Sequence, residues 1–247
     1  MSVLQSVGYR HSPSAINGFV DAPQKELAKR LFGIVSPNND NLRRGNTVEA
    51  AVRYILHRSP NESDLRRYVD SKWDKLKGVD PKYYQWCADA ASLMAKELEQ
   101  RQLKRIKKFQ EPFRGTYGAF SCYGLADFTF NDVTVDIKAP SRMPNYGIPN
   151  TNWIRQQSFY WGLSGKNRRF AILYGTNKKC EYYEIPQKEL AEGWEIMQSN
   201  MSWIEKIDNL CQNKQDWIDM FPFPDTNSFY YSNENFKQQI TKLLKGD

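Results

Sequence analysis

Three charged residues give this sequence a set of groups that could do chemistry: Asp127, Asp136 and Lys138. Asp136 and Lys138 are two positions apart, so on a β-strand they point from the same face. Two carboxylates that lie side by side repel each other unless a cation lies between them. A divalent metal ion with Lys138 beside it would relieve that repulsion, because hard divalent ions prefer carboxylate oxygens. The set therefore predicts a metal site of the kind that cleaves phosphodiester bonds.

A β-hairpin would bring the three residues together. Residues 124–130 and 133–138 are two short strand-like segments, and only two residues separate them, as in a tight turn. Counting outward from that turn places position 127 opposite position 136, at a Cβ separation of roughly 4.5–5.5 Å. The same count gathers apolar residues on the other face, namely Ala126, Phe128, Phe130, Val133, Val135 and Ile137. The alternative is an exposed strand edge with a surface ion pair, and the apolar face argues against it.

Two helical pairs could complete the site. Glu49 lies four residues after Gly45 and four before Arg53 in a predicted helix, and the alternative role for it is a surface ion pair with Arg53. Gln156 and Tyr160 are also four apart, so both point from one face of a later helix. For this second pair the alternative is ordinary helix packing, because apolar and aromatic residues surround it.

Taken together, these motifs and their order resemble the PD-(D/E)XK nuclease superfamily, in its RecB-like and lambda-exonuclease-like branch. The similarity consists of Gly45-xxx-Glu49, Gly124-xx-Asp127, Asp136-Ile137-Lys138, Gln156-xxx-Tyr160 and an opening run at Ser12–Asn17. It extends over about residues 10–185. The resemblance implies a restriction-endonuclease-like core, in which a small central mixed sheet is flanked by helices.

The resemblance also implies a role for each residue of the motifs. It implies one or two Mg²⁺ or Mn²⁺ ions held by three carboxylates and one backbone carbonyl, which belong to Glu49, Asp127, Asp136 and Ile137. Lys138 would orient or deprotonate the attacking water and stabilise developing charge. Gln156 and Tyr160 would position the metal ligands or the DNA backbone. Because Ala22 precedes Pro23 and only Cys211 lies late in the chain, the iron–sulfur cluster of some relatives is not expected.

Composition and charge agree with a nucleic-acid partner. The chain has 247 residues, a net charge of +7 and a pI near 9.1, and a basic protein attracts polyanions. Candidate phosphate contacts are Lys104, Arg105, Lys107, Lys108, Arg142 and Arg155. The alternative for these cations is a solvated basic face. The four cysteines are scattered without a CxxC pair, so neither a zinc site nor a disulfide framework is expected.

The elements that must position the site are predicted along one domain, residues 1–247. Its parts are a mainly helical segment over 1–110, a catalytic sheet core over 111–186 and C-terminal helices over 187–247. The elements are a helix start at Ser12–Ile16, an amphipathic stretch over Lys25–Leu31, a loop at Ser36–Asn41, helices at 46–57, 62–76 and about 81–108, the hairpin over 117–139, a helix at 152–163, strands at 168–175 and 179–185, and helices near 187–212 and 233–245. This order predicts an α/β or α+β fold.

The sequence thus predicts a metal-dependent DNA nuclease that acts in recombination, repair or degradation of DNA, as in a phage or mobile element. The preference for an exonuclease comes from the branch that the chain resembles. Two alternatives stay open: a non-catalytic DNA-binding or recombination-accessory module on the same scaffold, and a structure-selective endonuclease. The expected partners are DNA and a single-strand annealing or recombination protein. No membrane span or signal peptide is predicted, so the expected location is the cytoplasm, that of the bacterial host if a phage encodes the chain.

Overall fold

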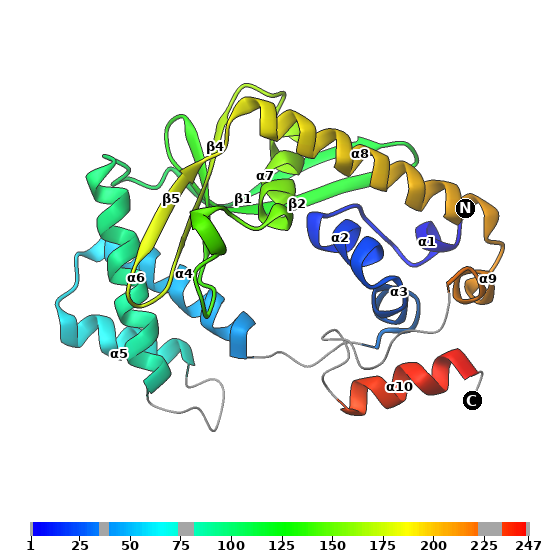
Figure 1. Ribbon diagram of the computed structural model, residues 1–247, viewed down its shortest axis with the longest axis horizontal. Helices are drawn as coiled ribbons and strands as arrows, with labels where there is room; N and C mark the ends of the chain where they lie inside the picture. Colours follow the sequence, from blue (N-terminus) through cyan, green and yellow to red (C-terminus); the bar gives the residue numbers. More distant parts are fainter. Residues whose placement is uncertain (1, 35–39, 74–81, 222–233, 246–247) are drawn as a thin grey trace. The chain divides into compact units, whose positions relative to one another are not determined.

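The computed structural model describes residues 2–34, 40–73, 82–221 and 234–245 (Figure 1). Its helices are α1 (Val3–Ser6), α2 (Pro13–Asp21), α3 (Pro23–Phe32), α4 (Asp40–Arg58), α5 (Glu62–Trp73), α6 (Lys82–Gln100), the 3₁₀ turn η1 (Asn145–Gly147), α7 (Thr151–Leu163), α8 (Gln187–Leu210), α9 (Lys214–Asp219) and α10 (Glu234–Lys245). The strands are β1 (Lys108–Tyr117), β2 (Phe120–Thr129), β3 (Val133–Lys138), β4 (Arg169–Gly175) and β5 (Cys180–Glu184). Helices around a small mixed sheet confirm the predicted fold class.

The chain divides into two compact units, and each is built from separate stretches of sequence. The first unit contains Met1–Pro37, Phe113–Gly124 and Ala191–Asp247, and the second contains Asn38–Pro112 and Leu125–Leu190. All residues of the predicted catalytic set lie in the second unit. The expectation of one domain over the whole chain stays a prediction.

The five strands form one sheet in the order β1-β2-β3-β4-β5. β2 and β3 are antiparallel, with Phe128 opposite Val135 and Thr129 opposite Thr134, which is the predicted register. The amide of Phe130 donates to the carbonyl of Val133 at 2.9 Å and closes the two-residue turn. The hairpin that the sequence predicts is therefore present, and its register sets Asp127 and Asp136 on one face.

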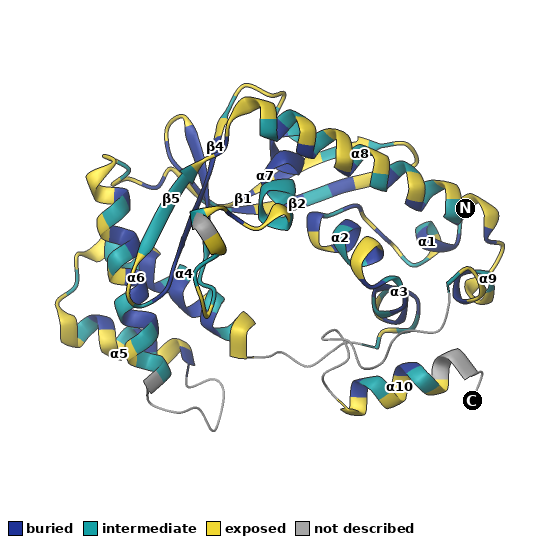
Figure 2. Cartoon of the chain, in the orientation of Figure 1, coloured by how far each residue is buried: buried dark blue, intermediate teal, exposed yellow. Residues whose placement is uncertain are grey.

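A mixed sheet results because the chain crosses over after β3. α7 connects β3 to β4, and these two strands are parallel, whereas β4 and β5 are antiparallel. β4 is buried from its second residue to its last, and β5 is only half-buried (Figure 2). α7 packs against β4, so the connection carries its side chains over the central strands.

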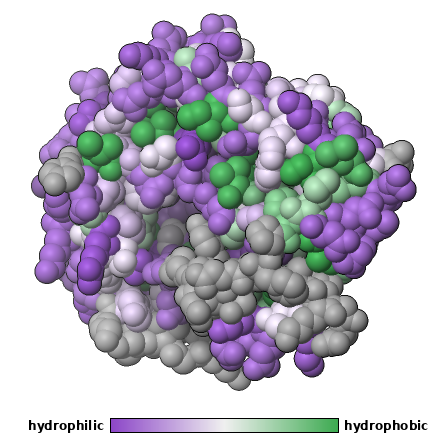
Figure 3. Space-filling view, turned by 45° about the vertical axis from the view of Figure 1, so that its right-hand side comes forward, coloured by the Kyte–Doolittle hydropathy of each residue, from purple (hydrophilic) through white to green (hydrophobic). Residues whose placement is uncertain are grey.

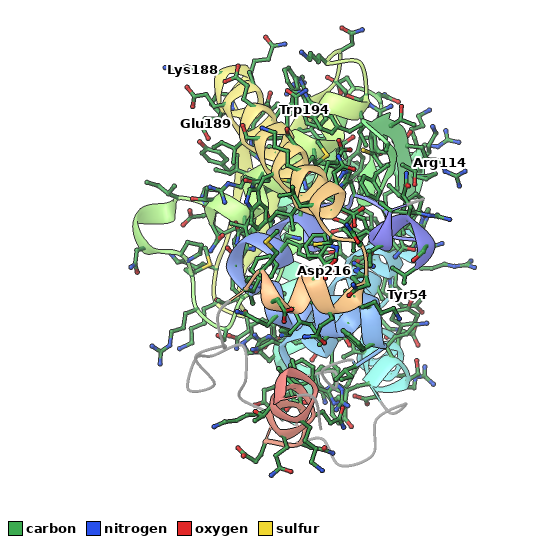
Figure 4. All side chains as sticks on the ribbon, turned by 90° about the vertical axis from the view of Figure 1, so that its right-hand side faces the viewer. Tyr54, Arg114, Lys188, Glu189, Trp194 and Asp216 are labelled. Carbon is green, nitrogen blue, oxygen red and sulfur yellow. The ribbon has the colours of Figure 1, made fainter. Side chains whose placement is uncertain are left out.

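The apolar face of the sheet packs on α4 and α6, and α5 packs on these two helices. This core contains Phe128, Val135 and Ile137 from the hairpin. The helices contribute Val48, Val52, Val69, Trp73, Ala91 and Met94. Tyr54 of α4, labelled in Figure 4, stacks on Tyr68 of α5 with 4.1 Å between ring centroids. Burying apolar surface stabilises the fold by about 25 cal/mol per Å². Burial of this face therefore determines which side of each strand is left for polar groups.

The first unit has a core of its own. Ser12 caps α2 by accepting a hydrogen bond from the amide of Ala15 at 3.3 Å, and Pro13 occupies the first helical position. Phe19 of α2 packs on Trp217 of α9, and the indole of Trp217 donates to Asp208 at 3.0 Å. The helix start predicted at Ser12 is thus confirmed.

The long helix predicted over 81–108 is wrong at its C-terminal end. α6 ends at Gln100, and Gln102 takes a left-handed φ of 63°. The amide of Leu103 donates to Leu98 and that of Gln102 to Glu99, which is the Schellman arrangement that ends helices. The chain then turns into β1, a strand that the sequence did not reveal.

Other boundaries also differ from the predictions. β2 begins at Phe120, so the hairpin strand is longer than predicted, and α4 begins at Asp40, inside the predicted loop. α1 and α9 were not predicted, and both are short helices whose N-caps carry capping boxes. Parts of the predicted loop at 36–41 and of the helix at 62–76 lie outside the described residues.

The surface is mainly hydrophilic on the face that Figure 3 shows, in keeping with a mean hydropathy of −0.72. In the described part of the chain, no helix combines the length and apolar character that crossing a membrane requires.

A buried ionic network ties the strands on the polar face of the sheet. The carboxylate of Glu111 in β1 accepts hydrogen bonds from Lys108 at 2.7 Å and from Thr129 at 2.6 Å, and Arg168 donates to it as well. Burial alone would raise the pKa of Glu111, but these donors outweigh it and lower the pKa from 4.5 to about 2. Ionised Glu111 therefore favours the folded state.

We expect Glu111→Gln to lower the free energy of unfolding at pH 7 by about 1–2 kcal/mol, a figure reduced for solvent screening. Because the folded-state pKa is lowered, the contribution of Glu111 is present above pH 4.5 and is lost as the pH falls towards 2. The gap between wild type and variant should close over that range in urea unfolding curves. Glu99→Gln, at an exposed position, is the control. A gap that stays constant with pH would contradict the network.

Candidate metal centre and nuclease site

Asp127, Asp136 and Lys138 come together on the polar face of the hairpin. Asp136 is fully buried, and its Oδ2 lies 2.6 Å from the ammonium of Lys138. Asp127 is half-buried, and its Oδ2 accepts a hydrogen bond from the amide of Ile137 at 2.8 Å. The paired strands thus place both carboxylates and the ammonium in one small volume, as the register predicted.

α7 adds the amide and the phenol that the sequence predicted on its inner face. Gln156 accepts from the ammonium of Lys138 at 2.9 Å, and its amide nitrogen lies 3.4 Å from Asp136 Oδ1. The same amide donates to the hydroxyl of Tyr160 at 2.9 Å. Tyr160 in turn donates to the carbonyl of Leu125 at 2.8 Å. This chain of hydrogen bonds fixes the position of Lys138 from the side of α7.

Glu49 reaches the same site from α4. It is half-buried, and its charge interacts with that of Asp136. The guanidinium of Arg53, one helical turn on, lies over the ring of Phe109 at 4.0 Å. The alternative role for Glu49 was a surface ion pair with Arg53, but Glu49 is half-buried and the charge of Asp136 affects its pKa more than that of Arg53 does.

Burial and neighbouring negative charge raise the pKa of Glu49 and of Asp127. Burial and then the charge of Asp136 raise the pKa of Glu49 above its ordinary value. Burial, followed by the charges of Asp136 and Glu49, raises the pKa of Asp127 well above its ordinary value. Burial would lower the pKa of Lys138, but the neighbouring carboxylates outweigh it and raise that pKa. The site is an environment in which negative charge is in excess.

The excess charge matches the donor set of a divalent cation. Three carboxylates against one ammonium leave two negative charges, and oxygen donors are those that Mg²⁺ and Mn²⁺ take. In the described part of the chain, no three His, Cys, Asp or Glu side chains are gathered closely enough to enclose an ion. The residues therefore fit a metal by charge and donor type, and Glu49, Asp127 and Asp136 would have to draw closer around it.

Other predicted residues are placed as follows. The amide of Ile137 donates to Asp127, whereas the predicted role belonged to the carbonyl of Ile137. Arg155 lies beside Gln156 on α7, with Nη1 3.4 Å from Asn152 Oδ1. Arg142 is exposed on the loop that follows β3. Arg142 follows Lys138 by four positions in the sequence.

The basic stretch lies at the other end of β3 and is not a helix end. Lys104, Arg105 and Lys107 belong to the loop before β1, and Lys108 opens β1, where it pairs with Glu111. The amide of Lys107 donates to the carbonyl of Thr129 at 2.7 Å, close to the hairpin turn. A cavity of about 660 Å³ lies next to this turn. Its lining includes Arg101, Arg105, Lys107, Arg169 and Tyr182.

Some residues around the site gave no signal in the sequence. The carbonyl of Leu125 accepts from Tyr160, and Leu125 is an unspecified position within the Gly124-xx-Asp127 motif. Arg44, which is buried, donates to the carbonyl of Ala139 at 3.3 Å, and its guanidinium lies 4.7 Å from the ring centroid of Trp86. It thereby holds the chain directly after Lys138. Such contacts depend on where α4 and α7 pack, so spacing alone could not have found them.

Comparison with known proteins supports the fold. No known protein family matches the sequence, and no curated protein matches it. The crystal structure of a candidate exonuclease from Eubacterium rectale matches with a TM-score of 0.61 and 13% identity, over 92% of this chain and 89% of that chain. The crystal structure of SSO0001 matches with a TM-score of 0.31 and 14% identity, over 74% and 84%, which is too low to carry an argument. This chain shares the fold of the first structure.

The electrostatics of the site predict that Asp127→Asn stabilises the protein in EDTA. A raised carboxyl pKa means that ionised Asp127 disfavours the folded state above its ordinary pKa, and asparagine keeps the oxygen that accepts from Ile137. We expect the melting temperature to rise by about 2–4 °C, which corresponds to a gain of about 1 kcal/mol in the free energy of unfolding for a chain of this size.

Asp132→Asn is the matched control, because Asp132 lies in the turn of the same hairpin and pairs with Arg169 at 2.6 Å. It should leave the melting temperature unchanged or lower it slightly. A lower melting temperature for Asp127→Asn at neutral pH would show that the carboxylates do not repel one another.

Proposed function

We propose that this chain is a metal-dependent DNA nuclease of the PD-(D/E)XK superfamily, and by its resemblance to the RecB-like and lambda-exonuclease-like branch an exonuclease. One observation carries the proposal. Asp127, Asp136 and Lys138 lie together on paired strands, and Gln156 joins them from α7, in the order of the superfamily motifs. The shared fold with a candidate exonuclease supports it.

The residues of the site divide the chemistry between them. Glu49, Asp127 and Asp136 would hold Mg²⁺ or Mn²⁺, which when bound acidifies water and offsets charge on the phosphate. Lys138 keeps its proton at neutral pH, because the carboxylates raise its pKa. Its ammonium therefore acts as a donor that orients water and stabilises developing negative charge. Gln156 and Tyr160 hold that ammonium in place through the contacts to Lys138 and Leu125.

Cleavage of DNA tests the proposal directly. Purified protein is incubated with end-labelled linear DNA in Mg²⁺, in Mn²⁺ and in EDTA. Wild type should cut only with metal, and Asp136→Asn and Lys138→Met should each lose activity by about 10³-fold or more, since several kcal/mol of barrier are at stake. Asp132→Asn in the same hairpin is the matched control and should cut at the wild-type rate.

The possible outcomes separate the candidate functions. Variants that digest DNA as fast as wild type would place the chemistry elsewhere. Wild type that binds DNA and never cuts it with any metal would favour the non-catalytic DNA-binding or recombination-accessory module. Cleavage of closed circular DNA at the rate of linear DNA would favour the structure-selective endonuclease.

DNA binding should depend steeply on salt, because phosphate contacts release counterions. In EDTA, Arg142→Ala with Arg155→Ala should reduce the slope of log K against log[salt] by about 1.5 and weaken binding. Arg105→Ala with Lys107→Ala removes cations at the far end of β3, about 16 Å away along the strand. That pair should leave cleavage of short oligonucleotides unchanged. Binding that is indifferent to salt would contradict a phosphate-contacting surface.

The biological setting belongs to the same proposal. DNA recombination, repair or degradation in a phage or mobile element, a single-strand annealing or recombination protein as partner, and the cytoplasm as location follow from the resemblance. The expectation that the chain holds no iron–sulfur cluster stays a prediction.

A further inference from the structure

Another cavity, of about 600 Å³, lies within the first unit and shares no residue with the acidic site. Tyr117, the last residue of β1, lines one side of it. The other lining residues follow one face of α8 over three turns, because they recur at intervals of three or four positions. They are Glu195, Gln198, Ser199, Ser202, Trp203 and Lys206.

Trp203 and Tyr117 supply two aromatic rings to this cavity. Trp203 is 39% exposed, and its ring packs edge-on against Phe221 with 6.1 Å between ring centroids. The half-buried ring of Tyr117 packs in the same manner on His11, which is fully buried, at 6.3 Å. Each ring is thus supported by a neighbouring ring and keeps part of its surface open to solvent.

The turn between β1 and β2 is held against α8 directly beside Tyr117. Gly118 in this turn has a φ of 53°, and a Cβ at this position would overlap the carboxylate of Glu205. Glycine adopts this conformation without strain, and it lets the carboxylate come up against the turn. Close packing of the turn on Glu205 fixes the position of Tyr117 relative to α8, so the cavity is preformed.

The polar side chains of the cavity are available to a ligand. Among the described residues, no hydrogen bond engages the side chains of Gln198, Ser199 and Ser202. Lys206 is exposed, and no carboxylate in the same part of the chain pairs with it. Glu195 lies at the other end of this face, about 16 Å away along the helix. The cavity therefore offers hydrogen-bond donors and acceptors, with positive charge at one end.

These features match the chemistry of one unpaired nucleotide. A nucleobase has flat faces that stack on aromatic side chains, and its edge carries hydrogen-bond donors and acceptors. The phosphate that follows it is an anion and favours a nearby ammonium. In a duplex the faces of each base are covered by the neighbouring bases, so only a single strand could offer a base to this cavity.

We propose that this cavity binds an unpaired nucleotide of single-stranded DNA, with the base stacked on Trp203 and a phosphate beside Lys206. The inference deepens the proposed function, on which it rests for the identity of the polymer. It adds a contact that lies outside the acidic site and needs no metal. Because the contact requires an open base, it favours a single strand over a duplex of the same length.

Binding of a short fluorescein-labelled oligothymidine in EDTA tests the proposal. Trp203→Leu removes the aromatic ring and should weaken binding by about 10-fold, within the range for loss of one stacked base. Trp203→Tyr keeps an aromatic ring and should stay within about threefold of wild type. Leu210→Ala is the matched control, because Leu210 is exposed near the end of the same helix and does not line the cavity.

An abasic oligonucleotide of the same length separates stacking from phosphate contacts. It keeps every phosphate and lacks the bases, so it should bind wild type about as weakly as oligothymidine binds Trp203→Leu. Its own affinity should not change in Trp203→Leu. Lys206→Gln should weaken binding of both oligonucleotides and reduce the slope of log K against log[salt] by about 0.7, the value for one contact to a single strand.

Each outcome decides the question. Oligothymidine affinity within twofold of wild type in Trp203→Leu would overturn the stacking site. An equal loss in Trp203→Tyr, or for the abasic strand, would show a structural effect of the substitution and would also overturn it. A wild type that binds oligothymidine no more tightly than the abasic strand has the same consequence. Because no metal is present, these results are independent of whether the acidic site cleaves DNA.

Discussion

Repulsion among carboxylates that cannot escape into water is the constraint on which this structure depends. Asp136 is fully buried, and its charge, together with burial, raises the pKa of both Glu49 and Asp127. Lys138 and the amide of Ile137 relieve part of that repulsion. Negative charge is still in excess, and the favourable packing in the rest of the protein offsets its cost in folding free energy. Proteins keep such unfavourable groups where they are useful, and this is the physical basis for locating function here.

The hairpin and its register could be predicted because they depend on local rules. Strict alternation of apolar and polar residues around a two-residue turn leaves one pairing that buries every apolar side chain. That pairing put Asp127 opposite Asp136, and the observed neighbours, Thr129 opposite Thr134, are those that counting from the turn predicts. The pairing of Gln156 with Tyr160 could also be predicted, because helical spacing determines which side chains share a face.

The contribution of β1 could not be predicted, because it depends on tertiary contacts. Charged and polar residues from Lys104 to Gln110 resemble a continuation of α6, and only the left-handed Gln102 ends that helix. No residue type there required it, since glycine is the usual choice at such a position. The same holds for Arg44, whose contact with the carbonyl of Ala139 exists only once α4 has packed against the sheet. Sequence patterns identified the residues of the candidate site and missed residues that pack around them.

The division into two units has a consequence for synthesis of the chain. The second unit ends at Leu190, whereas the first needs Ala191–Asp247 to join segments that were made much earlier. Domains made on the ribosome generally form as soon as their last segment emerges. The acidic site can therefore form before the segment that completes the first unit has been synthesised. The second unit would then fold first, although the first unit begins earlier in the sequence.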